Sequence, residues 1–276
     1  MTYEKRELLL DIQNVSLTFG DHVILRNVNA QIRNIVRHDK ATQGQIVGLL
    51  APSGMGKTML FNIISGLLKP DPGGRVLIGP DQHPTEIGLV GVLQQKYPLF
   101  NHRTVHGNLA VAAGRGMPKA SKKEREEKID FYLNKFGLLD KKDKYPVQLS
   151  GGQRQRIAIA QQLLCSENFL LFDEPFSGLD VLAIKKVTDL MVEVSNLNEN
   201  NTLIVVSHDV SSTCAISDHV WLMGREDGPD GTKIPGAKIL KEFNLIDEGL
   251  AWRPDVQQDH KFLEYVKDIK SYFSLL

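Results

Sequence analysis

A turn-rich segment that ends in a lysine and a hydroxyl residue is the first part of this sequence suited to chemistry. Small residues let backbone N–H groups converge on a polyphosphate, and a helix that starts behind them adds its positive end. Lys57 would supply a point charge for the β and γ phosphates, and Thr58 a hydroxyl ligand for Mg²⁺. We therefore predict a phosphate-binding loop formed by Ala51, Pro52, Ser53, Gly54, Met55, Gly56, Lys57, Thr58 and Met59.

This segment departs from the strict phosphate-loop pattern at Ala51, which replaces the first glycine. If the position requires φ above zero, alanine costs about 1 kcal/mol, whereas at negative φ little is lost. The alternative interpretation is a glycine-rich turn whose lysine caps a helix. An apolar run before the loop and helical spacing after it favour the phosphate loop.

Two acidic residues follow a second apolar run, Phe169 to Phe172. A buried strand would deliver Asp173 to Mg²⁺, directly or through water. Glu174 would lie closer to the γ-phosphate, where it can orient and deprotonate the attacking water. Alone, this pattern is equally typical of a strand that ends in an acidic turn, and the phosphate loop upstream favours the catalytic interpretation.

The pentapeptide Leu149 to Gln153 is the most specific signal in the chain. Its chance occurrence in such a chain is on the order of 10⁻⁴ to 10⁻³ from average residue frequencies. A serine and two glycines that open a helix form another anion-binding N-terminus, here Ser150, Gly151, Gly152 and Gln153. With the residues that follow, Leu-Ser-Gly-Gly-Gln-Arg-Gln-Arg resembles the signature sequence of the ABC ATPases.

The resemblance to ABC ATPases assigns roles to further residues. Phe19 matches the aromatic residue that stacks on adenine. Gln95, next to Gln94, matches the glutamine that contacts Mg²⁺ and the attacking water. Asp180 ends a Ser-Gly-Leu-Asp run that resembles the loop communicating across the dimer, and His208 matches the histidine at the γ-phosphate.

The resemblance covers about residues 8–225 and implies a dimer in which each signature faces the nucleotide of the other subunit. Both halves of this composite site are present, so a homodimer would have two equivalent sites; pairing with a related ATPase is the alternative. Gln161 is a departure, because many relatives carry arginine there. We expect a packing consequence rather than lost chemistry.

Strand-like and helical segments alternate along the chain, which predicts an α/β fold. The resemblance implies a P-loop NTPase core of the RecA-like kind with a mainly parallel sheet, an N-terminal antiparallel β subdomain and an inserted α-helical subdomain at about 97–149. Ser121 and Glu124 have the spacing of a capping box. We expect strands at 8–15, 23–32, 46–50, 75–79, 169–172 and 202–206, helices at 59–68, 105–113, 153–165 and 181–196, and a loop at 34–45.

The C-terminal part of the chain lies beyond the resemblance, so we expect an ATPase domain at 1–225 and an extension at 226–276. Helical spacing relates Phe262, Val266, Ile269 and Phe273. A terminal helix that packs this stripe on the core is the first interpretation, and a dimer or regulatory contact is the second.

Composition and charge argue against several function classes. The formal net charge is zero, which gives no reason to expect nucleic-acid binding. The apolar runs are too short to span a bilayer, and the N-terminus lacks the apolar core of a signal peptide. Cys165 and Cys214 have no C-x-x-C spacing and are expected to be reduced, buried thiols of a cytosolic protein. A membrane role would come through a partner.

The resemblance to ABC ATPases implies an ATP-hydrolysing transporter subunit that uses Mg²⁺-ATP. We expect it at the cytoplasmic face of the inner membrane, bound to integral membrane permease subunits and through them, indirectly, to a solute-binding protein. The run 173–180 resembles bacterial import ATPases, especially those for nitrate and sulfonate.

The alternatives are an exporter subunit, a non-transport ABC ATPase of DNA repair, chromosome maintenance or translation, and another phosphate-loop enzyme such as a kinase. The signature argues against the kinase, and the lack of a long coiled-coil insertion or of a second ATPase module argues against the non-transport class.

Overall fold

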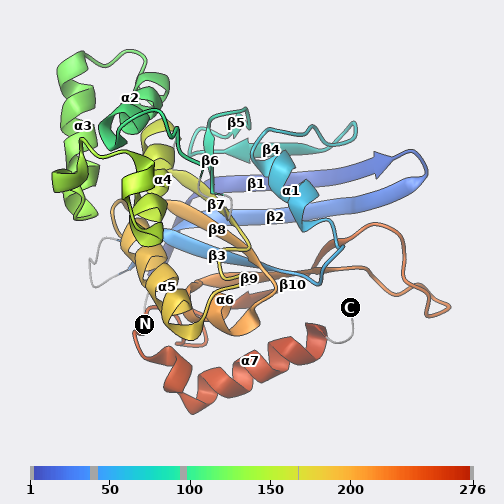
Figure 1. Cartoon of the computed structure of the whole chain (residues 1–276). Helices are drawn as coiled ribbons and strands as arrows, with labels where there is room; N and C mark the ends of the chain where they lie inside the picture. Colours follow the sequence, from blue (N-terminus) through green and yellow to red (C-terminus); the bar gives the residue numbers. More distant parts are fainter. Residues whose placement is uncertain (1–2, 38–42, 94–97, 167, 274–276) are drawn as a thin grey trace.

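Two β-sheets lie side by side, one antiparallel and one mostly parallel, in a computed structural model that describes residues 3–37, 43–93, 98–166 and 168–273 (Figure 1). The antiparallel sheet has the order β2-β1-β4-β5. Its strands are β1 (Tyr3–Phe19), β2 (His22–Arg37), β4 (Arg75–Ile78) and β5 (His83–Pro84). The predicted antiparallel N-terminal subdomain is confirmed.

The second sheet has the order β10-β9-β3-β8-β7-β6, and only β10 runs antiparallel to its neighbour. Its strands β3, β8 and β9 are buried throughout, as expected for parallel strands covered on both faces. The strands are β3 (Gln45–Leu50), β6 (Val90–Leu93), β7 (Phe169–Asp173), β8 (Thr202–Ser207), β9 (His219–Gly224) and β10 (Lys238–Asn244).

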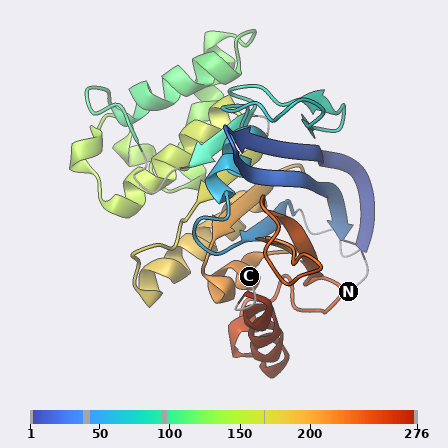
Figure 2. The ribbon, with the colours of Figure 1, turned by 90° about the vertical axis from the view of Figure 1, so that its right-hand side faces the viewer.

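The two faces of this sheet pack into different cores, because successive side chains of a strand point to opposite sides. In β7, Leu170 and Phe172 join the core shared with the helical layer, whereas Phe169 and Leu171 join the core shared with the antiparallel sheet and α1. Figure 2 shows the resulting layers from the side. The helices around the sheet are α1 (Lys57–Ile64), α4 (Gly151–Cys165), α5 (Val181–Ser195) and α6 (Val210–Ile216).

Several predicted boundaries were wrong: the strand expected at 8–15 extends over Tyr3–Phe19, and the helix expected at 105–113 continues to Gly116. The expected loop at 34–45 begins later, because β2 continues to Arg37 and the buried Asn34 donates a 2.7 Å hydrogen bond to Glu7 Oε1. Helix α1 ends at Ile64 rather than at residue 68. Gly66 has a φ of 74°, and a Cβ there would lie 2.7 Å from the backbone of Glu86, so the chain leaves the helix at this point.

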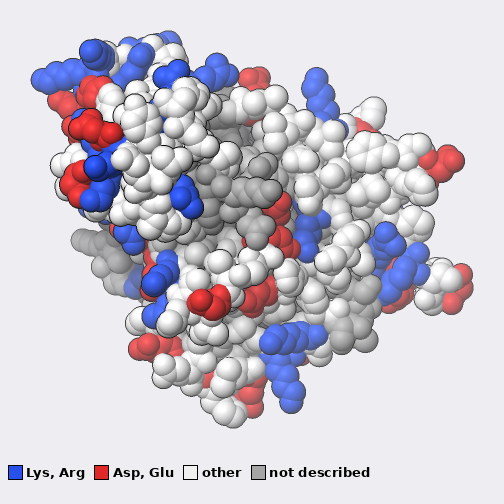
Figure 3. Space-filling view, viewed as in Figure 1, with Lys and Arg blue, Asp and Glu red and all other residues white. Residues whose placement is uncertain are grey.

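The inserted helices α2 (Val105–Gly116) and α3 (Lys122–Lys135) pack with α4 at one end of the molecule. Two short 3₁₀ helices, Leu139–Lys141 and Pro146–Gln148, connect α3 to α4. The predicted capping box of α3 is confirmed, because Ser121 Oγ accepts from Glu124 N and Glu124 Oε2 accepts from Ser121 N. Lys, Arg, Asp and Glu are interspersed over this end (Figure 3).

The C-terminal segment contributes β10 to the sheet and then forms α7 (His260–Phe273) after a 3₁₀ turn at Val256–Gln258. Phe262, Val266 and Ile269 are buried against α6, β9 and β10, so the expected packing of this stripe on the core is confirmed. None of the described helices combines the length and apolar character that crossing a bilayer requires. Cys214 is buried as expected, but Cys165 is only half-buried because it lies at the last turn of α4.

Candidate active site

The phosphate-binding loop connects β3 to α1 in the order that the sequence predicts. Gly54 and Gly56 have φ values of 82° and 77°, a conformation that side chains disfavour. Gly56 is the N-cap of α1 and offers no side-chain cap, so the first N–H groups of the helix are left for a ligand. A Cβ on Gly56 would lie 3.0 Å from Ile24 and Leu25, which shows that β2 supports the loop from behind.

Ala51, where the sequence departs from the loop pattern, is not among the described residues with positive φ. Its side chain is fully buried in the core between the two sheets. Alanine therefore fits this position without the backbone cost considered above, and its methyl group adds buried apolar area.

Lys57 is the one basic side chain of the loop, and it contacts both the loop itself and Glu174, which follows β7. Its Nζ donates to the carbonyl oxygen of Ala51 at 2.7 Å and to that of Pro52 at 3.4 Å. The same Nζ lies 3.3 Å from Glu174 Oε1. The predicted loop lysine and the predicted catalytic base are therefore brought into direct contact.

Glu174 is the central residue of this group. Its backbone N–H donates to Val206 O of β8 at 2.8 Å, and its second carboxylate oxygen, Oε2, lies 2.8 Å from His208 Nδ1. The φ of Glu174 is 48°, a conformation that costs a non-glycine residue about 1 kcal/mol or more. Side-chain exposure rises from 10% for Lys57 through 26% for Glu174 to 57% for His208, so the carboxylate bridges the interior and the solvent.

The strand order explains why these residues meet. Strands β3, β8 and β7 are parallel neighbours, so the loops that follow their carboxyl ends lie at the same end of the sheet. Lys57 follows β3, Glu174 follows β7 and His208 follows β8. The three side chains therefore gather although they are far apart in the sequence.

Asp173 ends β7 and is half-buried. Burial raises the pKa of Asp173 above its usual value, the neighbouring charge of Glu174 raises it further, and Lys57 opposes the shift. A bound divalent cation would stabilise the ionised form of such a carboxyl group. Thr58, in the first turn of α1, is exposed.

The signature residues form the predicted anion-binding turn at the start of α4. Ser150 is the N-cap, its Oγ accepts from Gln153 N at 3.3 Å, and Gln153 Oε1 accepts from Ser150 N at 2.9 Å. Gly151 and Gly152 are exposed, and a Cβ on either would meet no atom within 4 Å. Among the described residues no hydrogen bond or ion pair connects this turn to Lys57, and α4 lies apart from α1 (Figure 1).

Asp180 caps α5 by accepting from Ala183 N at 2.8 Å. Next to it lies an apolar surface that sequence analysis missed, because Val181 is 82% and Leu182 is 73% exposed. The helical spacing of the apolar residues in α5 could have indicated this exposure. The buried stripe of the helix starts at Val187, and Val181 and Leu182 fall outside that stripe.

Two other predicted site residues stand outside this group. Phe19 lies at the end of β1 and is 50% exposed, opposite His22 in the β1–β2 hairpin. Gln95 and its neighbour Gln94 lie outside the described residues.

Comparison with known proteins agrees with these motifs. The model of the ABC transporter family matches residues 39–177. The chain is 35% identical to a probable ABC transporter ATP-binding protein, PEB1C, of Campylobacter jejuni, over 80% of this chain and 88% of that protein. It is 32% identical to the arginine transport ATP-binding protein ArtM of Bacillus subtilis, over 80% and 91%.

A third relative is the sulfate/thiosulfate import ATP-binding protein CysA of Pectobacterium atrosepticum, 38% identical over 78% of this chain and 64% of that protein. Among solved structures, cbiO1 from Clostridium perfringens has the same fold, with a TM-score of 0.70 at 24% identity, covering 88% of this chain and 91% of that one.

Proposed function

Because the chain belongs to the ABC transporter family and is an ATP-binding and ATP-hydrolysing subunit that energises solute transport, we propose how its own residues carry out this work. The observation that carries the proposal is the position of Glu174, whose two carboxylate oxygens contact Lys57 and His208.

ATP binding uses the phosphate loop and the β1–β2 hairpin. The N–H groups of the loop, from Ala51 to Met59, surround the β and γ phosphates, and Lys57 turns its ammonium group to them. The positive φ values of Gly54 and Gly56 support this role. Phe19 stacks on the adenine ring, which fits its exposure at the end of β1.

Mg²⁺ is the metal that this site fits. The described residues contain no group of three or more His, Cys, Asp or Glu side chains that could hold a metal by themselves. Mg²⁺ at nucleotide sites needs only one or two protein ligands besides the phosphates. Asp173, Thr58 and Gln95 would hold it, and when bound it neutralises charge on the phosphates.

Glu174 is the general base of the hydrolysis. It accepts a proton from the attacking water, which then adds to the γ-phosphorus as the bond to ADP breaks. His208 Nδ1 holds the orientation of this carboxylate, and the histidine contacts the γ-phosphate. The backbone of Glu174, fixed by its hydrogen bond to Val206, keeps the carboxylate at the end of the sheet.

Each ATP is completed by the signature of a second subunit, a copy of this chain or a related ATPase. The helix N-terminus formed by Ser150, Gly151, Gly152 and Gln153 is accessible, because among the described residues no atom lies within 4 Å of a Cβ placed on either glycine. Asp180, beside the exposed Val181 and Leu182, joins the same interface. ATP favours the closed dimer because it supplies contacts that only this state can make.

The ATPase acts on integral membrane permease subunits at the cytoplasmic face of the inner membrane, and indirectly on a solute-binding protein. The helical subdomain at about 97–149 transmits the ATP-driven motion to the permease. This subdomain belongs to an ATPase domain of residues 1–225, which is followed by the extension 226–276. The named cargoes of ArtM and CysA, arginine and sulfate or thiosulfate, support import of a small polar solute, and we propose the nitrate and sulfonate class.

The test is the variant Glu174→Gln, which keeps the shape of the side chain and removes the base. We expect ATP hydrolysis to fall by about 10²–10⁴-fold while ATP binding persists and ATP-bound dimers accumulate in light scattering. Glu193→Gln, an exposed change on α5, is the matched control and should behave as wild type. Hydrolysis by Glu174→Gln at the wild-type rate would exclude this residue as the base.

The transport partner is tested separately. A tagged chain should co-purify from membranes with a subunit that contains several apolar spans. Recovery of only nucleic-acid or ribosomal partners would favour the non-transport class instead.

A further inference from the structure

The segment Arg225–Ala237, here called the arm, connects β9 to β10 and packs on the outer edge of β2. Arg26 N donates to Ala237 O at 2.9 Å, and Ala237 N donates to Ile24 O at 2.9 Å. In Figure 1 the arm is the orange loop at the same end of the molecule as the turn between β1 and β2. The arm therefore extends the antiparallel sheet next to Phe19, which ends β1.

Side chains of the arm fix it to this part of β2. The carboxylate of Glu226 forms ion pairs through both oxygens, Oε2 with Arg26 Nη2 and Oε1 with Lys238 Nζ at 3.0 Å. Gly236 fits closely against β2, because a Cβ there would lie 2.7 Å from Val23 Cγ1 and from Arg26 Cβ. The contact leaves no room for a side chain at Gly236, so a displacement of the arm would be felt directly at Val23.

The arm also has hydrogen bonds of its own. Gly228 N donates to Thr232 O at 2.7 Å, and Ile234 N donates to Glu226 O at 2.9 Å. Asp230 Oδ1 accepts from the hydroxyl group of Thr232 at 2.7 Å. Internal hydrogen bonds of this kind oppose local opening, so the arm can act as a fixed support.

The other strand of the hairpin is held by Asp71, which follows α1 in the chain. Thr18, the residue before Phe19, donates from its backbone N to Asp71 Oδ1 at 3.3 Å and from its Oγ1 to Asp71 Oδ2 at 2.9 Å. Thr18 pairs with Val23 across the hairpin, and Phe19 pairs with His22. Asp71 and the arm therefore hold the two strands directly behind Phe19.

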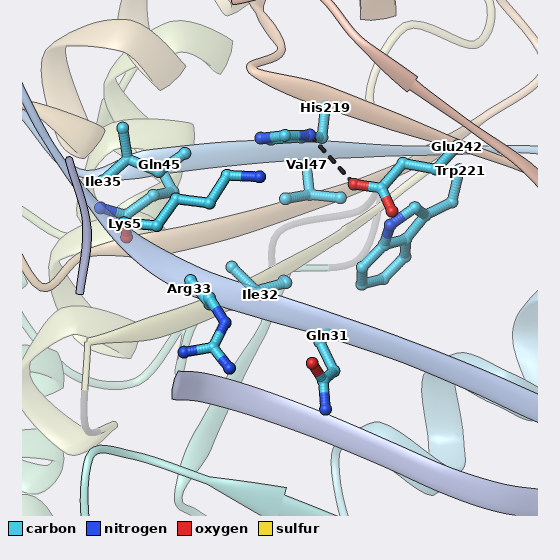
Figure 4. Close-up of a pocket in the computed structure, with 10 residues that line it drawn as sticks. All are labelled: Lys5, Gln31, Ile32, Arg33, Ile35, Gln45, Val47, His219, Trp221 and Glu242. Atoms are coloured by element: carbon cyan, nitrogen blue, oxygen red, sulfur yellow. Dashed lines mark ion pairs between the residues drawn. The ribbon is translucent and has the colours of Figure 1, made fainter. Parts of the chain in front are cut away.

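Farther along β2 the two sheets separate around a cavity of about 200 Å³ (Figure 4). Its walls come from β1, β2, β3, β9 and β10. Ile32 and Ile35 of β2 line it, as do His219 of β9 and Glu242 of β10. The arm bridges β2 to the C-terminal segment beyond this cavity, at the end of the hairpin that carries Phe19.

We propose that the arm and Asp71 position Phe19 for the adenine base, which makes Glu226 and Asp71 positioning residues for the base of ATP. This inference rests on the proposed stacking of Phe19 on adenine. Phe19 is 50% exposed, so its placement depends on the hairpin that carries it. A stacking surface that is fixed before binding loses less conformational entropy when the ligand arrives.

The phosphate end of the site is held independently of these two supports. Leu25, the part of β2 behind the phosphate loop, is fully buried and pairs with Leu17 of β1. Lys57 is held by the carbonyl oxygen of Ala51 and by Glu174. Weakening either support should therefore reduce affinity for the base and leave affinity for the phosphates unchanged.

The experiment compares two ligands of the full chain by titration calorimetry, ATP and inorganic triphosphate, which has the phosphates and lacks the base. Mg²⁺ is omitted so that neither ligand is hydrolysed. Glu226→Gln and Asp71→Ala should each raise the dissociation constant of ATP by about fivefold and that of triphosphate by less than about twofold. In the ATPase assay with Mg²⁺, KM for ATP should rise while kcat changes by less than about twofold.

A double variant tests whether the arm acts through its ion pair with β2. Because Arg26 and Glu226 contact each other, Arg26→Gln combined with Glu226→Gln should bind ATP no more weakly than Glu226→Gln alone. The matched control is Arg253→Gln, which breaks a 2.6 Å ion pair with Asp259 in the C-terminal extension. This control should bind both ligands as the wild type does.

Phe19→Ala tests the proposed function separately and should raise the dissociation constant of ATP by about tenfold without affecting triphosphate. If Phe19→Ala loses ATP affinity but Glu226→Gln and Asp71→Ala do not, the inference is overturned and the stacking role stands. Equal losses of ATP and triphosphate affinity in the two support variants would also overturn it. Unchanged ATP binding by Phe19→Ala would overturn the stacking role, and the inference with it.

Discussion

One carboxylate oxygen of Glu174 lies 2.8 Å from Nδ1 of His208, and the other lies 3.3 Å from Nζ of Lys57. If the histidine orients the base, His208→Ala should lower kcat of ATP hydrolysis by about 10²-fold, with a much smaller rise in KM from the lost contact to the γ-phosphate. His208 is largely exposed, so the free energy of unfolding should stay the same. Phosphate-release kinetics and thermal unfolding together measure both effects.

A second histidine–glutamate contact provides the control for this prediction. His260 and Glu264 lie 3.6 Å apart on the exposed face of α7. His260→Ala should retain full ATPase activity. A loss of activity in both variants, or a rise in KM alone for His208→Ala, would contradict the proposed role of His208.

The composite site across two subunits can be tested with two inactive variants. Lys57→Ala removes the loop lysine, and Ser150→Arg blocks the signature turn, so each homodimer should be inactive. When the two are mixed, a heterodimer has one site in which both parts are intact. We expect about a quarter of the wild-type rate if the subunits pair at random. A mixture as inactive as its components would contradict equivalent sites formed in trans.

Ala51 provides a test of the departure from the loop pattern. Because Ala51 is fully buried and lacks a positive φ, Ala51→Gly should reduce the free energy of unfolding by about 1 kcal/mol through lost burial and added chain entropy. ATP affinity should change by less than about twofold. Urea denaturation and ATP titration measure these quantities. A clearly tighter ATP complex would mean that the alanine strains the loop.

A buried carboxyl group at the start of β9 predicts a pH dependence of stability. Asp218 Oδ2 accepts from Ile46 N at 2.7 Å, and its Oδ1 accepts from Trp252 Nε1 at 2.6 Å. Burial raises the pKa of Asp218 to about 6 from 3.8, and the hydrogen bonds from Ile46 and Trp252 oppose the shift. The folded chain therefore binds this proton more tightly than the unfolded chain.

The sign follows from that difference. As pH rises from about 4 to about 6, the unfolded chain loses the proton first, so the free energy of unfolding falls by up to about 3 kcal/mol and is then constant. Asp218→Asn should remove this component. Urea unfolding of both proteins across this pH range gives the difference, and identical pH profiles would show that Asp218 keeps its proton affinity on folding.

The local patterns of the sequence determined much of the site. The phosphate loop, the acids after β7 and the capping boxes at Ser121 and Ser150 depend on neighbouring residues, because turn conformations and helix caps are set within a few positions. Periodicity likewise located the buried strands β3, β7 and β8 and the stripe of α7, but it missed β6 and β9. The ends of β2 and α1 were misplaced because packing against other strands decides where such elements stop.

Only the tertiary structure decided which of these residues meet. The strand order places β8 between β3 and β7, and this arrangement, which no local pattern contains, brings Lys57, Glu174 and His208 together. The same holds for the hydrogen bond from Trp252 to Asp218 and for the cavity lined by five strands. Residue types and spacing thus specify the chemical groups, whereas contacts between distant segments depend on how whole sheets pack, and this is a property of the complete fold.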